Sequence, residues 1–107
     1  MANSETDFGL VDYQPEQGRL ILRSPSFDFD SFPSLGEQLV SLLSASVVER
    51  QQDADIHSWL IDFEGCRLML KAEHYTESLW LEALTPSESR EECDFLASLF
   101  ERGFLLK

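Results

Sequence analysis

The chain has 107 residues, of which 43% are hydrophobic, and its 20 acidic against 8 basic residues give a formal net charge of −12. This length fits one domain and this hydrophobic content can fill one core, which excludes disorder for most of the chain. The negative charge repels phosphate groups, so we expect no nucleic acid and no anionic membrane as a partner.

The cellular compartment is predicted from the lack of a signal peptide and of a membrane-spanning segment in the sequence. Residues 1–7 are polar and acidic, without the cationic and apolar regions of a signal peptide. The apolar runs are a few residues long, against the roughly 20 that a membrane-spanning helix needs. Nothing marks the chain as secreted, so we expect Cys66 and Cys93 to be reduced thiols. We therefore expect a cytoplasmic protein.

The first part of the chain predicts a tail and a hairpin. We interpret residues 1–7 as a disordered acidic tail and residues 8–107 as a single α+β domain. Residues 8–13 and 19–23 are strand-like runs, and the proline and glycine within residues 15–18 suit a turn between them.

A helix is predicted after a loop over residues 24–32. Pro33 suits the first helical turn, where its missing N–H costs nothing. The apolar stripe at helical spacing consists of Leu35, Leu39, Leu42, Leu43 and Val47. We expect the helix to end near residues 47–48 and the chain to turn over residues 51–55.

Three strand-like runs follow, over residues 59–63, 66–72 and 79–83. In each run apolar residues occupy every second position. Residues 64–65 suit a two-residue hairpin loop and residues 75–78 suit a four-residue loop. These runs predict an antiparallel meander.

The last helix is predicted from a start signal and an apolar stripe. Thr85 and Glu88, with Pro86 between them, have the pattern of a capping box. Arg102 and the glycine after it are typical of a helix end. We expect the buried stripe to consist of Phe95, Leu96, Leu99 and Phe100, and residues 104–106 to pack after the turn.

These elements predict an α+β fold in which an antiparallel sheet of four or five strands carries two helices packed on one face. The predicted loops place Phe63 opposite Cys66 and His74 opposite Leu79, so one face is continuously apolar and must pack against the helices. On the other face the expected pairs are Asp62 with Arg67, Leu60 with Met69, Met69 with Leu84, Lys71 with Glu82 and Glu73 with Trp80. The long connection before the meander leaves open which edge of the sheet the first hairpin joins.

This second face is the candidate functional surface. Its candidate interaction residues are Leu60, Arg67, Met69, Lys71, Trp80 and Leu84, and Arg19, Ile21 and Arg23 would extend it on the first hairpin. Apolar and cationic side chains together suit the docking of an acidic partner. Three interpretations stay open: a solvated face, a face covered by the N-terminal segment, and a face that binds another protein or a second copy in a homodimer.

An alternative hypothesis is a small metal-dependent enzyme or metal sensor. The same register brings Asp55, His57 and His74 together at one end of the hairpin. Imidazole and carboxylate groups at such spacing can bind a divalent ion such as Zn²⁺. The competing interpretation is that these histidines are structural or lie on the surface.

No motif indicates catalysis. We expect Cys66 on the core face and Cys93 near the buried side of the last helix, both as small buried hydrophobic residues. The sequence contains neither a Gly-x-Ser-x-Gly elbow nor a glycine-rich phosphate loop. We therefore assign no catalytic residue and no cofactor, and favour a non-enzymatic interaction or regulatory module. A third hypothesis, mimicry of nucleic acid, needs acidic charges ordered like a phosphate track.

One further indication comes from resemblance. The stretch WLIDFEGCRLMLKAEH from Trp59 to His74, followed by ESLWLE at residues 77–82, resembles a family of small acidic gammaproteobacterial proteins of unknown function. The resemblance covers the meander and the last helix. It implies a small bacterial cytoplasmic protein, and it carries over no catalytic residue.

Overall fold

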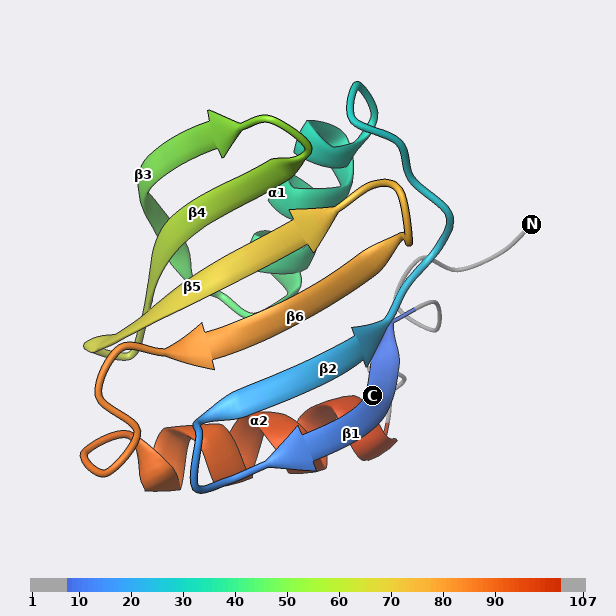
Figure 1. Ribbon diagram of the computed structural model, residues 1–107. Coiled ribbons are helices and arrows are strands. Elements are labelled where there is room, and N and C mark those ends of the chain that lie inside the picture. The colour runs from blue at the N-terminus through green and yellow to red at the C-terminus, as the bar shows by residue number, and fades with distance from the viewer. Residues whose placement is uncertain (1–7, 103–107) are drawn as a thin grey trace.

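The computed structural model describes residues 8–102, which form an antiparallel sheet with two helices behind it (Figure 1). In chain order the elements are β1 (Gly9–Gln14), β2 (Arg19–Arg23), α1 (Phe32–Leu42), β3 (Ser46–Asp53), β4 (Ile56–Phe63), β5 (Cys66–Glu73), β6 (Ser78–Ala83) and α2 (Arg90–Arg102). The α+β class and the antiparallel sheet are confirmed. The sheet has six strands, in the order β1-β2-β6-β5-β4-β3, so the expected four or five was wrong. The tail predicted over residues 1–7 and the packing predicted for residues 104–106 lie outside the described residues.

The strand that the sequence did not reveal is β3. It is an edge strand, and all of its residues except Val47 are exposed, so the apolar alternation that marks a half-buried strand is absent. The helix before it ends earlier than predicted, because Ser44 takes a left-handed conformation with φ of 56°. Val47 then pairs with Ile61 in the sheet and does not continue the helix. The turn predicted over residues 51–55 is confined to residues 54–55, since β3 extends to Asp53.

The N-terminal hairpin is confirmed, and the structure fixes its place in the sheet. β2 pairs with β6, with Ile21 opposite Trp80. The backbone N–H of Ala83 also donates a hydrogen bond of 2.8 Å to the carbonyl of Gly18 in the hairpin turn. The hairpin therefore extends the meander on the β6 side.

The register of the meander was predicted correctly in one of its two hairpins. Phe63 lies opposite Cys66, as expected, whereas β5 and β6 are shifted by two residues. The observed pairs are Met69 with Glu82, Lys71 with Trp80 and Glu73 with Ser78, so the pairs expected there were wrong. The turn occupies residues 74–77, because the Glu73 carboxylate accepts hydrogen bonds from the backbone N–H groups that follow it. A shift of two keeps every side chain on its predicted face.

Both helices pack on one face of the sheet, as predicted (Figure 1). Side chains from both helices and from the inner face of the strands form one hydrophobic core. α1 contributes Phe32, Leu35, Gly36, Leu39 and Val40, and α2 contributes Cys93, Leu96, Ala97 and Phe100. Neither of these helices combines the length and apolar character needed to cross a bilayer.

The start of α2 differs from the prediction. The capping box was wrong, because residues 85–89 form turns in which the Thr85 carbonyl accepts the N–H groups of Glu88 and Ser89. The helix begins only at Arg90. Its buried face is rotated from the expected stripe, since Phe95 is 50% exposed while Ala97 is buried.

Candidate interaction surface

The face of the sheet opposite the helices carries the candidate site. In Figure 1 this face is turned toward the viewer, and no helix or strand among residues 8–102 lies over it. We call the outward side chains of the four central strands the outer face. They are Arg19, Ile21 and Arg23 on β2, Ser78, Trp80 and Glu82 on β6, Arg67, Met69, Lys71 and Glu73 on β5, and Ile56, Ser58, Leu60 and Asp62 on β4.

An apolar strip crosses the outer face. We define it as Ile21, Trp80, Met69 and Leu60. Ile21 lies directly opposite Trp80, and Met69 lies directly opposite Leu60. Since Trp80 faces Lys71, it is the diagonal neighbour of Met69, which joins the two pairs across four strands. All four side chains are partly exposed.

Leu84 does not pair with Met69 as predicted, because Met69 lies opposite Glu82. Leu84 follows the end of β6, where its backbone N–H donates a hydrogen bond of 3.4 Å to the carbonyl of Arg67. Its side chain is 54% exposed. Leu84 therefore lies at the border of the outer face, beside the start of β5. The fourth apolar residue of the strip is Ile21 and not Leu84.

The charge of the outer face differs in sign from that of the whole chain. The face holds four of the 8 basic residues, Arg19, Arg23, Arg67 and Lys71, but only three of the 20 acidic ones. Acidic residues return at the two edges of the sheet, where Asp12 lies opposite Ile21 and Glu49 opposite Leu60. The outer face is therefore a weakly positive stripe on the surface of an acidic molecule.

The three carboxylates of the outer face are all engaged by their own chain. Glu82 accepts hydrogen bonds from the Arg19 guanidinium at 3.5 Å and from the Trp80 indole at 3.1 Å. Asp62 pairs with Arg67 at 3.1 Å, as predicted, and also accepts from a turn N–H. Glu73 accepts from the Thr76 hydroxyl at 2.6 Å, the main reason why the pKa of this carboxyl lies below its ordinary value.

Lys71 differs from Arg19 and Arg67, which each pair with a carboxylate of the outer face. It lies between Trp80 on β6 and Ser58 on β4, and it forms no ion pair with any described residue. The expected pair with Glu82 fails because Glu82 faces Met69 and binds Arg19. The sequence could not reveal this, because the Arg19–Glu82 contact depends on β2 pairing with β6.

The alternative metal site is not assembled. No group of three His, Cys, Asp or Glu residues in the described part of the chain could hold a metal ion. The His57 imidazole is buried, and its Nε2–H donates a hydrogen bond of 3.0 Å to the carbonyl of Phe29. His74 and Asp55 lie close to each other through the backbone, since the His74 N–H donates to the Asp55 carbonyl. His57 thus packs in the core, which matches the structural interpretation of this residue.

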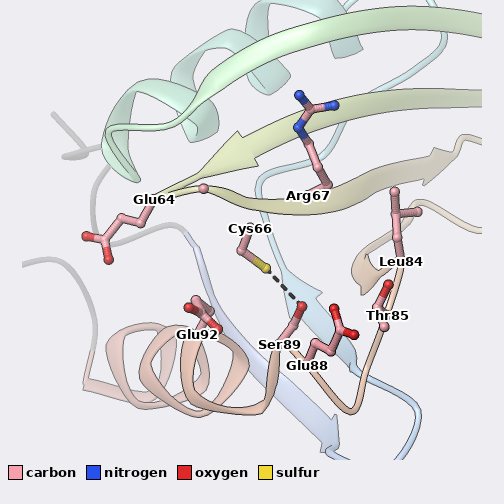
Figure 2. Close-up of a pocket in the computed structure, with 9 residues that line it drawn as sticks. Glu64, Cys66, Arg67, Leu84, Thr85, Glu88, Ser89 and Glu92 are labelled. Carbon is pink, nitrogen blue, oxygen red and sulfur yellow. Dashed lines mark hydrogen bonds between the residues drawn. The ribbon is translucent and has the colours of Figure 1, made fainter.

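A separate cavity of about 330 Å³ lies between the β4–β5 turn and the start of α2 (Figure 2). The Cys66 thiol points toward Ser89 and donates a hydrogen bond of 3.1 Å to its hydroxyl, while Glu64, Glu88 and Glu92 line the rim. No described histidine, lysine or arginine forms a hydrogen bond with this thiol that would activate it. The cavity has no local sequence signal, because Cys66 on β5 and Ser89 before α2 are 23 residues apart in the chain.

The second cysteine is equally unsuited to nucleophilic chemistry. Cys93 is 1% exposed, and burial raises the pKa of its thiol to about 11. At neutral pH the nucleophilic thiolate form is therefore scarce. Both cysteines are free and buried, as predicted.

One comparison with known proteins gives a match. A family model described as "Protein of unknown function (DUF3630)" matches residues 8–101. No curated protein matches the chain, and no solved structure does.

Proposed function

Since the chain belongs to the DUF3630 family, a family of proteins of unknown function, we propose its function from the outer face. The protein is a non-enzymatic interaction or regulatory module that docks a protein, either another one or a second copy, on this face. The observation that carries the proposal is the apolar strip, flanked by half of the chain's basic residues on a molecule of net charge −12.

The physical reason is that the two kinds of side chain serve different steps of binding. Partly exposed Trp80 and Met69 lose apolar surface to water on docking, and aromatic and methionine side chains are enriched at interface cores. Cations around them guide an approaching partner and fix its orientation. A sheet face that only contacts solvent requires neither an apolar strip nor a cluster of cations around it.

The proposed setting is the cytoplasm of a gammaproteobacterium. This proposal is supported by the sequence resemblance and by the two free cysteines. The binding test therefore belongs in living bacterial cells.

The test is site-specific photocrosslinking. A photoreactive amino acid replaces Leu60 or Ile21 on the outer face, or Ser41, an exposed position on α1, as the matched control. We expect a discrete protein adduct from the two outer-face positions and none from Ser41. Trp80→Glu should abolish the adduct while circular dichroism shows an intact fold, because Trp80 lies outside the core.

Two results would contradict the proposal. Adducts that form equally from Ser41 and from Leu60 would mean that the crosslinker samples the solvent without a docking site. A lack of any adduct from Leu60 and Ile21 in the intact chain, with adducts only after deletion of residues 1–7, would instead mean that the chain's own N-terminal segment occupies the face.

A further inference from the structure

Resting on the proposed docking function, we infer that the occupant of the outer face is an acidic segment of another protein, which sets a carboxylate against Lys71 and apolar side chains against Trp80 and Met69. The inference concerns the chemistry of the partner. The inference depends on which basic residues of the outer face already pair with a carboxylate of their own chain: Arg19 and Arg67 do, and Lys71 does not.

The argument begins with the central position of Lys71. This residue lies on β5, directly opposite Trp80 and beside the apolar strip, and it is only partly exposed. A partner that covers Trp80 and Met69 must also cover the Lys71 ammonium group and remove part of its water. A buried ammonium without a counter-charge is costly, so a well-matched partner supplies a carboxylate there.

A second copy of the chain is a poorer source of that carboxylate than an acidic segment is. In a two-fold dimer each outer face meets itself, and its only acidic residues are Asp62, Glu73 and Glu82. Both oxygens of each of these carboxylates already accept hydrogen bonds from their own chain. Two bodies of charge −12 also repel each other on approach.

A nucleic acid fits the face less well than an acidic protein. The stripe of cations is narrow, and Asp12 and Glu49 stand at its two borders. A long phosphate backbone that crossed the face would meet these carboxylates and the acidic remainder of the molecule. A short acidic protein segment can end within the stripe.

The first experiment uses the full chain labelled with ¹⁵N and a synthetic peptide of repeated Glu-Leu-Asp-Phe as the probe. Amide shifts are followed during titration, with a matched peptide that has lysine at every acidic position as the control. We expect saturable shifts confined to the four central strands for the acidic peptide, weakening as salt is raised. The lysine peptide should cause none.

A pair of charge reversals separates the local effect from the effect of net charge. Lys71→Glu and Arg102→Glu change the total charge by the same amount, but Arg102 lies on α2, away from the outer face. We expect Lys71→Glu to weaken binding of the acidic peptide by roughly tenfold and Arg102→Glu by less than about twofold. Equal effects of the two variants would overturn the role of Lys71.

Light scattering over a concentration series distinguishes the other occupants. A wild-type dimer that Trp80→Glu converts to a monomer would overturn the acidic partner and keep the outer face as the docking site. Shifts produced by a DNA or RNA oligonucleotide and not by the acidic peptide would reassign the partner class. If crosslinks from the outer face persist while the acidic peptide causes no shifts, the docking function stands and the inferred partner is wrong.

Discussion

The Tyr13 hydroxyl on β1 donates a hydrogen bond of 2.5 Å to the Asp94 carboxylate on α2. Arg90 binds the same carboxylate at 3.2 Å from one turn earlier in the helix. Burial, followed by the hydrogen bond to Asp94, raises the pKa of the Tyr13 phenol, so it stays a donor at physiological pH. This contact joins an edge strand to the last helix, two elements far apart in the sequence.

The first prediction concerns this contact. Tyr13→Phe keeps the ring but removes the donor, so we expect the melting temperature to fall by a few degrees. Thermal unfolding followed by circular dichroism measures the effect. Tyr75→Phe is the matched control, because Tyr75 is 74% exposed and its hydroxyl has no described partner. Equal melting temperatures for wild type and Tyr13→Phe would show that the contact adds nothing to stability.

The second prediction concerns acid. The hydrogen bond from Tyr13, and after it the one from Arg90, hold the pKa of Asp94 below its ordinary value. A carboxyl with a depressed pKa in the folded state stabilises fully above its unfolded pKa, and this contribution is lost as the pH falls through the folded value. We therefore expect stability to decline below about pH 4, and Asp94→Asn to make that decline shallower.

Urea unfolding between pH 3 and pH 7 measures this decline. Glu101→Gln is the control, since it removes a charge from the same helix at a position without a described hydrogen-bond partner. The pKa of Asp28, which accepts from the backbone N–H of Ser31, is also lowered, so part of the decline remains in Asp94→Asn. An unchanged slope in Asp94→Asn would contradict the assignment.

Local patterns predicted most of this fold, and the failures have physical causes. Alternation along residues 59–63 and 66–72 was sufficient to set the inner and outer faces, because burial on one side enforces a period of two. β3 escaped detection because an exposed edge strand needs no such pattern. The residues of the candidate surface were found by the same alternation.

The electrostatics of that surface could not be predicted in the same way. The partner of Glu82 is Arg19, which is 63 residues away in the sequence and becomes a neighbour only through the β2–β6 pairing. The two-residue shift between β5 and β6 arises from the turn that Glu73 caps. Predicting that Lys71 lacks an ion pair required both facts, and neither has a local sequence signal.

The third prediction tests the structural role of His57. Its ring packs against Phe29 and Phe32, with centroid distances of 4.4 and 4.9 Å, and its Nε2–H binds the Phe29 carbonyl. His57→Phe keeps an aromatic ring but leaves that carbonyl without its donor, so we expect a loss of about 1–2 kcal/mol in the free energy of unfolding. His74→Phe should cost less, since the His74 side chain forms no hydrogen bond with a described residue.

The fourth prediction concerns metal. A ligand that binds only the folded state raises the melting temperature by mass action. Because His57 donates to a carbonyl in the core, we expect Zn²⁺ to leave the melting temperature of the wild type unchanged, as measured against the same protein in chelator. A rise that His57→Ala and His74→Ala together remove would restore the metal hypothesis.

The fifth prediction concerns Gly36 on α1. A Cβ at this position would lie 2.8 Å from Cζ3 of Trp59 and 3.0 Å from Cζ of Phe32, and both rings are buried. Trp59 also lies under the Arg50 guanidinium, 4.7 Å from the ring centroid, and Arg50 forms an ion pair with Glu37. The indole therefore has contacts on both sides that oppose a shift.

For Gly36→Ala two effects compete. Alanine gains about 1 kcal/mol over glycine in a helix interior, whereas forcing a methyl group into a packed core costs about 1–3 kcal/mol. We expect a net loss of stability in urea unfolding, accompanied by a changed Trp59 fluorescence in a Trp80→Phe background. Ser41→Ala, at an exposed position of the same helix, should be neutral or stabilising. If Gly36→Ala matched Ser41→Ala in stability, the indole would have to be free to move, and the contact between Gly36 and Trp59 would not fix the position of α1 on the sheet.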